Sequence, residues 1–481
     1  MSCCGSMGVR FAAAALMMPL LAASGGADAD VTYEVEAITL VGDTLPGYGG
    51  ATFLSVDGTG SLAVNDAGQV VHGGIVSGGS VSCPAGSWCW GVYLATTSGV
   101  TDVILEGDAA AGTTEVFERI CSGCPPLQYV SLNAEGDVAF GGWFGSGPSQ
   151  GTGAFVDQHL STQLVYAALS EQTAPDTGGG TYIHVLGVSM NDARTVGWRS
   201  AITGGSATEG IFSSVAGYFT PQYLALTGQA APTAGGTFSG FPDGPRLSGH
   251  EAAFTANVSG GSATNGVFAV TLVSRLKRAV ALQGTAAPNT GGSYATLYAP
   301  AINAGGDVVF ESTVTGGTSA GGIFFDDGST EIDVALLGQA APGAGATFLE
   351  FKRPAINASG QVAFVGRYDG SGDNGVFLWT DGTLVPIALT GQDAPDSVGG
   401  TYTVFDNAVA ISDSGTIAFR ALISGGSSGS GVFLASPAVP SVPVLDPWGV
   451  GLLLAALGCM GVVMARSRRV KPDPAPREGV E

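Results

Sequence analysis

The sequence contains few charged residues, and basic residues are the scarcest. Lys and Arg together number 17 of 481 residues, against 39 Asp and Glu, which gives a formal net charge of −22. Nucleic-acid-binding proteins neutralise phosphates with clustered Lys and Arg, so this composition argues against a nucleic-acid partner. Only four histidines are present, and none recurs beside a nucleophilic side chain. The residue pattern predicts no cofactor and favours a role without catalysis.

The sequence also lacks the periodicity of amphipathic helices. Outside the two chain ends, no segment places apolar residues at the three- to four-residue spacing of an amphipathic helix. Short apolar runs alternate instead with turns rich in Gly, of which the chain has 78. Runs this short, bounded by turn residues, are typical of β-strands. The hydrophobic fraction of 45% is ample for a folded core, so the glycines are interpreted as turn residues rather than as a sign of disorder.

One segment, Ile356–Phe364 (INASGQVAF), recurs along the chain about every 55 to 70 residues. In four of the copies Asn is followed three residues later by Gly, which predicts a type I turn between two strands, because Asn accepts a backbone hydrogen bond and Gly tolerates positive φ. A degraded copy, Leu247–Phe254, lacks the Asn. Self-similarity of this kind predicts a repeat architecture. The other copies contain Asn65, Asn133, Asn191, Asn303 and Ser412 at the turn.

Each repeat contains four apolar runs. In the sixth they are Phe348–Ile356, Gln361–Arg367, Gly375–Trp379 and Leu384–Leu389. Seven such units predict an all-β fold, a seven-bladed β-propeller of four-stranded blades over residues 31–436. The seventh unit ends after its third run, so the N-terminal run Val35–Val41 is expected to complete the last blade and close the ring. An open solenoid of stacked β-units is the alternative.

A second recurring segment, for example Leu389–Pro395 (LTGQDAP), joins each fourth run to the next repeat. Its Gly and Pro predict a rigid connection between blades. These connections are expected on one face of the ring, around the central funnel, where a polar residue after the Gly is a candidate ligand contact. Loop structure alone also explains that residue. The aromatic residue that opens the next strand is assigned to packing between blades. The candidate ligand-binding residues are Asp43, Asp108, Gln229, Gln339 and Gln392.

The cysteines of the predicted propeller are Cys83, Cys89, Cys121 and Cys124. Disulfides are expected in an exported protein, and four cysteines allow three pairings, so local and cross-blade pairs both stay open. Cys121–Cys124 also has the spacing of a redox or zinc motif, without the βαβ pattern or the His pair that would support one. A calcium loop is an alternative at Asp369, Ser371 and Asp373, although the Gly and Glu of a calcium-binding loop are missing there.

The two chain ends predict a location. In residues 1–29, Arg10 precedes an apolar stretch from Phe11 to Ala23, and Ala27 to Ala29 offers a cleavage site, as in a signal peptide handled by the Sec translocon and signal peptidase. A Pro-rich linker, 437–447, precedes an uncharged, mostly apolar stretch, 448–465, and a basic tail, 466–481. This order predicts a transmembrane helix with the tail in the cytoplasm and the repeats outside.

The C-terminal residues resemble a known sorting signal. The sequence VPVLDPWG, with Pro443, Leu445, Trp448 and Gly449, is similar to the IPTLSEWG of the bacterial IPTL-CTERM signal, a relative of PEP-CTERM signals, and departs from it at several positions. The apolar stretch and a cluster of arginines follow, as in that signal. The repeats resemble those of NxxGxxAF tandem-repeat proteins, which carry interchangeable ("choice-of-anchor") C-terminal anchors. The arginines of the cluster are Arg466, Arg468 and Arg469.

This resemblance implies that an exosortase-type enzyme recognises and cleaves the tail. It also implies an inner-membrane intermediate, with the repeats outside, and then the cell surface or extracellular matrix as the final location. The sequence therefore predicts an exported, surface-anchored, non-catalytic propeller that binds or scaffolds, with extracellular polysaccharide as an expected partner. The alternatives are a propeller enzyme acting on extracellular glycans and a structural surface-layer protein. Acidic residues or histidines from several blades at one funnel mouth would favour the enzyme, and a lining of Gly, Ser and Gln the scaffold.

Overall fold

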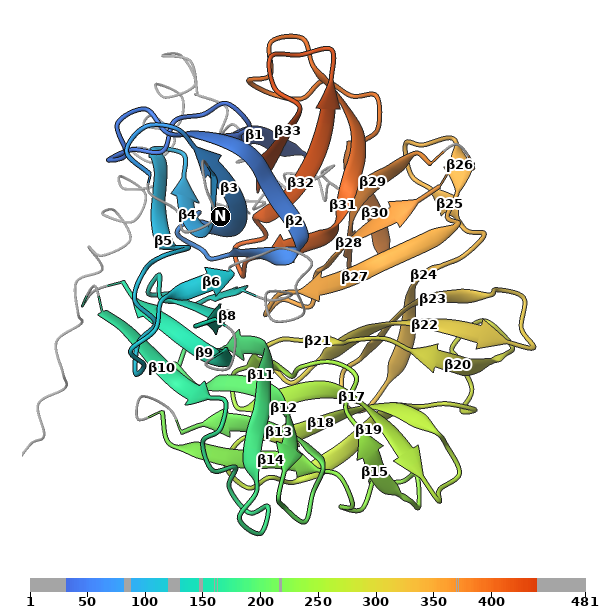
Figure 1. The fold of residues 1–481 in the computed structure, drawn as a ribbon. Helices are drawn as coiled ribbons and strands as arrows, with labels where there is room; N and C mark the ends of the chain where they lie inside the picture. The colour runs from blue at the N-terminus through green and yellow to red at the C-terminus, as the bar shows by residue number, and fades with distance from the viewer. Residues whose placement is uncertain are drawn as a thin grey trace, which may run out of the picture. The chain divides into compact units, whose positions relative to one another are not determined.

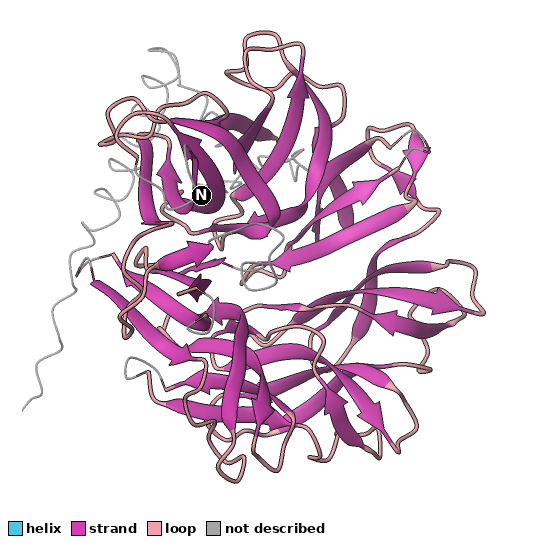
Figure 2. Cartoon of the chain, in the orientation of Figure 1, coloured by secondary structure: helices cyan, strands magenta, loops and turns pink. Residues whose placement is uncertain are grey.

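A computed structural model of the chain describes residues 32–438, apart from 82–87, 120–129, 147–149, 160, 162, 216–218, 369 and 371. Every regular secondary-structure element in this part of the chain is a β-strand (Figure 2). No helix that is long and apolar enough to cross a membrane occurs among these residues. The predicted signal peptide, transmembrane helix and basic tail lie outside them.

Apart from one two-stranded hairpin, the strands of the described residues form seven antiparallel sheets that are arranged as blades in a ring (Figure 1). Three blades consist of four continuous strands in sequence order. Blade 1 contains β2 (Thr52–Val64), β3 (Val70–Ser77), β4 (Trp88–Thr96) and β5 (Gly99–Leu105). Blade 3 contains β11 (Thr181–Met190), β12 (Val196–Thr203), β13 (Glu209–Ser214) and β14 (Pro221–Leu226). Blade 6 contains β27 (Glu350–Ile356), β28 (Val362–Arg367), β29 (Asn374–Thr380) and β30 (Thr383–Leu389).

In three other blades the first strand is divided into two short strands that pair with the same neighbour. Blade 2 contains β6 (Phe117–Arg119), β7 (Val130–Leu132), β8 (Val138–Phe144), β9 (Gly151–Gln158) and β10 (Gln163–Leu169). Blade 4 contains β15 (Thr237–Gly240), β16 (Arg246–Ser248), β17 (Glu251–Ser259), β18 (Asn265–Thr271) and β19 (Lys277–Leu282). Blade 5 contains β20 (Ser293–Leu297), β21 (Ala301–Ile302), β22 (Val308–Thr315), β23 (Gly321–Asp326) and β24 (Glu331–Leu336). A small hairpin of β25 (Ala340–Ala341) and β26 (Ala346–Thr347) lies between blades 5 and 6 in sequence.

The seventh blade joins the two ends of the ring. It contains β31 (Thr401–Ile411), β32 (Ile417–Ser424), β33 (Ser430–Pro437) and, as its outer strand, the N-terminal β1 (Tyr33–Leu40). β1 pairs antiparallel with β33 from Tyr33 opposite Pro437 to Leu40 opposite Gly431. The predicted closure of the last blade by the N-terminal strand is therefore confirmed, and the open solenoid is wrong.

Three aromatic side chains hold the strands of a blade together. In blade 6, Phe364 and Phe377 are cross-strand partners whose ring centroids are 5.7 Å apart. Phe348 stands edge-on to Phe377 at 5.0 Å. Gly375 precedes this cluster because a Cβ there would lie 2.6 Å from a methyl group of Leu389 on the fourth strand. The aromatic residues at the first strands of blades 1, 3, 4, 5, 6 and 7 are at most 2% exposed, which confirms their assignment to the core.

Packing between blades holds the ring as a whole. One buried cluster contains Val365 and Val376 of blade 6 together with Tyr402 and Phe419 of blade 7. Because each blade covers the apolar face of its neighbour, the first strands of all blades stay aligned along the centre of the ring. The turns that end these strands are thereby brought together.

Candidate functional site

The recurring Asn organises its own turn. The Oδ1 of Asn357 accepts hydrogen bonds from the amides of Ser359 (3.1 Å) and Gln361 (2.9 Å). Its Nδ2 donates to Oε1 of Gln361 at 2.8 Å. Gly360 closes the turn with a φ of +76°, a conformation that glycine adopts without steric cost. The predicted turn is therefore present, and Asn357 is 2% exposed.

The same Asn side chains also connect neighbouring blades. The Nδ2 of Asn357 donates to the carbonyl oxygen of Ser412 in blade 7 at 3.1 Å. Asn303 donates in the same way to the carbonyl of Asn357, at 3.0 Å. Further bonds of this kind run from Asn65 to the carbonyl of Asn133 (3.0 Å) and from Asn191 to that of Gly249 (2.8 Å). Because each bond links one turn to the turn of the next blade, the motif stabilises the ring as well as the turn.

Three aspartates that follow the turn residue make a second set of inter-blade bonds. Asp192 accepts a hydrogen bond from the amide of Ala134 at 2.9 Å, and Asp413 accepts one from the amide of Ala358 at 2.7 Å. Asp66 accepts one from the amide of Ser414 at 2.7 Å, which joins blade 1 to blade 7. All three residues are exposed. In each case one carboxylate oxygen is used in the bond and the residue stays open to solvent.

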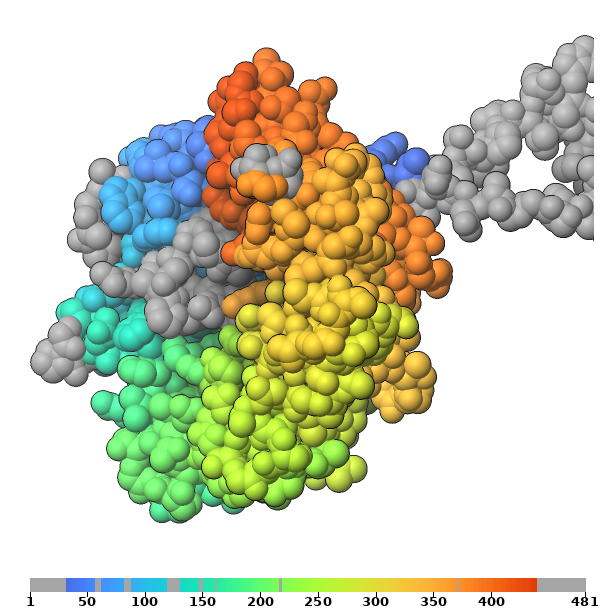
Figure 3. Space-filling view, turned by 90° about the vertical axis from the view of Figure 1, so that its right-hand side faces the viewer, coloured from blue at the N-terminus to red at the C-terminus, as the bar shows by residue number. Residues whose placement is uncertain are grey.

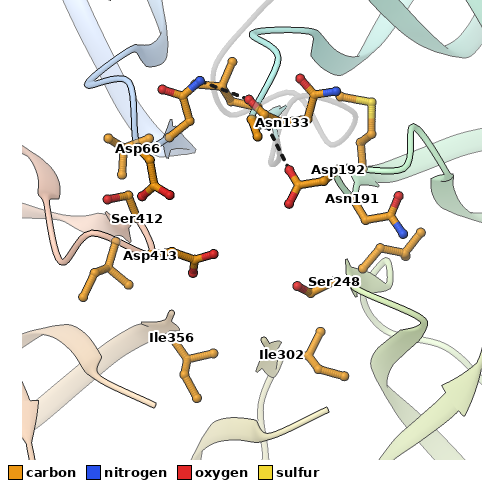
Figure 4. A pocket seen from close by; sticks show the side chains of 16 residues that line it. Asp66, Asn133, Asn191, Asp192, Ser248, Ile302, Ile356, Ser412 and Asp413 are labelled. Atoms are coloured by element: carbon orange, nitrogen blue, oxygen red, sulfur yellow. Dashed lines mark hydrogen bonds between the residues drawn. The ribbon is translucent and has the colours of Figure 1, made fainter. Parts of the chain in front are cut away.

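These turns surround a cavity of about 210 Å³, here called the motif-turn cavity. All seven blades contribute to its lining. The carboxylates of Asp66, Asp192 and Asp413 point toward its centre (Figure 4). Ile302 and Ile356 lie on the opposite side of the cavity from Asn133 (Figure 4). The cavity is therefore acidic over blades 7, 1 and 3 and apolar over blades 5 and 6.

Two further cavities follow along the inner strands. An apolar one of about 200 Å³, here called the waist cavity, shares Val64 and Ile411 with the motif-turn cavity. The other, of about 310 Å³ and here called the charged cavity, shares Arg353 and Asn407 with the waist cavity. The shared lining residues place the three cavities in series along the centre of the ring.

The charged cavity holds two glutamates in opposite electrostatic situations. Burial raises the pKa of Glu311 from 4.5 to about 7, and Lys352 opposes this rise. Glu350 instead accepts hydrogen bonds from Nζ of Lys352 and, at 2.9 Å, from Nε of Arg367, and these bonds hold its pKa below its ordinary value. Tyr298, which also lines the cavity, is 43% exposed. Glu311 is thus partly protonated near neutral pH while Glu350 stays ionised.

The five candidate residues of the blade connections bond within their own loops, as the alternative of loop structure alone expects. Each side chain turns back and accepts a hydrogen bond from the backbone amide three residues earlier, as Asp43 does from Leu40 (2.7 Å) and Gln392 from Leu389 (2.8 Å). None of the five lines a central cavity. This bond gives the recurring position a role in the loop, and ligand binding there stays a prediction. The remaining three bonds are Leu105 to Asp108, Leu226 to Gln229 and Leu336 to Gln339.

The motif-turn cavity was not expected from the sequence, which favoured the connections on the other face of the ring. The Asn was assigned to turn formation, and its bonds agree with that assignment. The missed signal is the Asp that follows the turn residue in three copies, Asp66, Asp192 and Asp413, since an acidic residue at that point is not needed by the turn itself.

The remaining candidates lie largely outside the described residues. Cys89 is disulfide-bonded, and since the other three cysteines of the propeller lie outside those residues, the pairing stays open. Of the calcium candidates only Asp373 is described. No group of three or more His, Cys, Asp or Glu that is arranged to hold a metal ion occurs in the described part of the chain. The sorting-signal residues also lie outside it.

The model of a family described as "Family of unknown function (DUF7453)" matches residues 29–143, 91–332 and 315–438. No curated protein matches the chain.

Similar solved structures include an oligogalacturonate lyase in complex with manganese, at 11% identity over 85% of this chain and 98% of the other, with a TM-score of 0.43. An oligogalacturonate lyase from Vibrio parahaemolyticus has 10% identity over 84% and 97%, with a TM-score of 0.44. The β-propeller domain of the Trilobed protease from Pyrococcus furiosus has 6% identity over 80% and 96%, with a TM-score of 0.43.

Proposed function

The chain belongs to DUF7453, a family of unknown function, so its role has to be inferred from its own geometry, and we propose that it is an exported, surface-anchored propeller that binds a neutral polysaccharide without catalysis. The predicted signal peptide and the IPTL-CTERM-like tail support export and anchoring. The net charge of −22 disfavours an anionic ligand. Hydroxyl groups of a neutral glycan are suitable donors to exposed carboxylates.

One observation carries this proposal: the acceptor groups of the motif-turn cavity are already held in place. Asp66, Asp192 and Asp413 each have one oxygen bonded to an amide of another blade. A ligand hydroxyl that bonds to such a carboxylate does not have to immobilise a free side chain, and this lowers the entropic cost of binding. Carboxylates on one side and isoleucines on the other match a sugar, which presents both hydroxyl and C–H surfaces.

The test replaces the three aspartates by asparagine in the full-length chain. Asn keeps an oxygen acceptor for the inter-blade amide and removes the charge, so the fold is expected to stay intact. Calorimetric titration with a panel of neutral glucans and neutral bacterial exopolysaccharides is expected to show binding to the wild type and an affinity at least about tenfold weaker for the triple variant. Equal affinities would remove the motif-turn cavity from the binding site.

The matched control is Asp396→Asn, a change at an exposed aspartate in the connection between blades 6 and 7, away from the motif turns. If the wild type binds no glycan of the panel, the proposed function is wrong. Sedimentation of the wild type over a range of concentrations separately addresses a structural surface layer, which would require self-assembly.

Export and anchoring have their own test. Cells that express the full chain are treated with an external protease, and the same is done with a chain that ends at Pro437. The full chain is expected at the cell surface and the shortened one in the medium or periplasm. Equal distributions would contradict the sorting role of the tail.

A second candidate function, an enzyme acting on extracellular glycans, is favoured by the charged cavity. A protonated Glu311 and an ionised Glu350 in one cavity are the groups that glycoside cleavage requires as acid and as second carboxylate. Incubation with the same glycans and measurement of new reducing ends tests it. If the wild type releases reducing ends and Glu311→Gln does not, the protein is an enzyme and the proposed function without catalysis is wrong.

A further inference from the structure

A fourth cavity, of about 370 Å³, adjoins the motif-turn cavity. It lies where blades 5, 6 and 7 follow one another in the ring, and Figure 3 shows these blades side by side in yellow to orange. Asp413 lines both this cavity and the motif-turn cavity. Two aromatic side chains, Phe325 of β23 and Trp379 of β29, form part of its wall, so we call it the aromatic cavity.

The aromatic pair is not explained by the repeat. The core ring of each blade is a different residue, Phe324 one position before Phe325 and Phe377 two positions before Trp379, and both are fully buried. Phe325 and Trp379 are only partly buried. At the position of Phe325, the other blades carry smaller side chains, namely Leu94, Val156, Ser213, Ala269, Leu378 and Leu434. At the position of Trp379 they carry Ala95, Asp157, Ser214, Val270, Asp326 and Ala435.

The two rings pack against each other and lie beside a neighbouring turn. Their centroids are 6.0 Å apart and their planes are inclined by 37°. Gly360 of the neighbouring turn approaches the ring of Phe325, since a Cβ there would lie 3.9 Å from it. Trp379 is paired across the blade with Val362 and Leu384. A partly exposed aromatic face of this kind is a surface on which the C–H face of a sugar ring can pack.

Polar acceptors lie beside the rings. Asp381 is exposed at the Asp-Gly turn between β29 and β30, where it has a φ of 49°. Asp413 accepts an inter-blade hydrogen bond with its Oδ1, so its position is set by the ring. Gln361, which also lines the cavity, is held by Asn357 at 2.8 Å. An aromatic face flanked by two carboxylates combines the two kinds of contact that a neutral sugar offers.

We propose that the aromatic cavity is a saccharide subsite in which one sugar ring stacks on Trp379 and its hydroxyl groups donate to Asp381 and Asp413. This inference rests on the proposed glycan-binding function and extends it, because Asp413 joins this subsite to the motif-turn cavity. A glycan chain of several sugar units would then run from the subsite into the centre of the ring, and longer oligosaccharides would bind more tightly than single sugars.

The test uses the full-length chain and substitutions that other blades already carry. Trp379→Ala installs the residue of blades 1 and 7, and Phe325→Leu installs that of blades 1, 6 and 7. Asp381→Asn keeps a residue that tolerates positive φ and removes the charge. The control is Trp88→Ala, which removes an aromatic side chain that is 41% exposed at the start of β4.

With the neutral glycan that the wild type binds, Trp379→Ala is expected to weaken affinity at least about tenfold and the other two variants several-fold, with the control unchanged. Quenching of tryptophan fluorescence on titration is expected in the wild type and reduced in Trp379→Ala. Affinity and quenching of wild-type size in Trp379→Ala would overturn the subsite.

The two proposals fail in different ways. If the wild type binds glycan and only Asp66→Asn and Asp192→Asn weaken binding, the function stands and the aromatic subsite is wrong. If the wild type binds no glycan, both are wrong. If the thermal transition shows that Trp379→Ala is unfolded, Phe325→Leu and Asp381→Asn are used instead. Wild-type affinity in both of these variants would equally overturn the subsite.

Discussion

The inter-blade bonds of the motif Asn can be tested by comparing two positions of the same ring. Asn303 and Asn357 make equivalent contacts, and each donates to a carbonyl of the next blade. They differ in the side chain four residues later, which accepts the other donor bond. That partner is Asp307 for Asn303 (2.8 Å) and Gln361 for Asn357 (2.8 Å). Replacement of either Asn by Asp keeps the shape and the Oδ1 acceptor and removes the two N–H donors.

The expected losses of stability differ because the partners differ. In Asn357→Asp, Gln361 can rotate its amide and donate to the new carboxylate, so one buried carbonyl, that of Ser412, loses its donor at a cost of about 1 to 3 kcal/mol. In Asn303→Asp, the partner Asp307 has no hydrogen to donate, and two carboxylates face each other. Breaking a buried charged contact in this way costs about 3 to 5 kcal/mol.

The stability of Asn303→Asp is also expected to depend on pH. Two carboxylates at hydrogen-bond distance share a proton, so the pKa of the pair rises in the folded state above its value of about 4 in the unfolded chain. The native state then binds more protons than the unfolded state between that value and the raised pKa. Stability therefore falls as pH rises through this range, and the deficit of Asn303→Asp shrinks as the pH is lowered from 7 to 5.

Urea unfolding of the wild type and both variants at pH 7 and pH 5, followed by fluorescence, measures these differences. Exposed Asn407→Asp serves as the control for the added charge. Equal losses in the two variants, or an Asn303→Asp deficit that does not change with pH, would refute the assigned hydrogen bonds.

Three further outcomes are expected. Burial lowers the pKa of His72 to about 4. The stability that the neutral His72 contributes is therefore fully present above pH 6.5, and the free energy of unfolding falls as the pH falls toward 4. In urea unfolding across this range, His72→Phe should reduce this acid-induced loss of stability by about 3 kcal/mol, and an unchanged dependence of stability on pH would contradict this. The raised pKa of Glu311 makes stability fall as pH rises from 4.5 toward about 7, so Glu311→Gln should be more stable than wild type by up to about 3 kcal/mol at pH 8 and about equal to it at pH 4; the same gain at both pH values would argue against this titration. Gly375→Ala places a Cβ 2.8 Å from the carbonyl oxygen of Ala388 and should lower the free energy of unfolding in urea by about 1 to 3 kcal/mol. Gly429→Ala, with nothing within 4 Å of the new Cβ, should be close to neutral in the same urea assay.

Much of the fold follows from local patterns. The four runs of the sixth repeat match β27 to β30 closely; for example, Gly375–Trp379 lies within β29. Strand alternation, an Asn-to-Gly turn and a Gly before an aromatic residue are encoded within a few residues of each other, so they can be recognised in a single sequence. Counting the runs was also sufficient to assign the N-terminal strand to the last blade, because a strand without partners and a blade without its fourth strand complement each other.

The sites were harder to predict. Phe325, Trp379 and Asp413 lie in three different repeats, and only the ring brings them to one cavity. Glu311 and Glu350 belong to blades 5 and 6, and their opposite pKa shifts depend on burial and on Lys352, which sequence spacing does not show. The candidates of the blade connections show the limit most clearly. Their recurrence was visible, but the backbone amide that each one binds was not.

Strand, turn and repeat number thus depend on residues that are close in sequence, whose φ preferences and side-chain alternation act before any long-range contact forms. The face that carries the cavity depends on how the first strands converge once seven blades pack on one another and β1 joins β33. That convergence places Asp66 beside Ser414, near opposite ends of the described chain. A contact of this kind exists only in the closed ring, and so do the acidic cavity and the aromatic cavity that we assign to ligand binding.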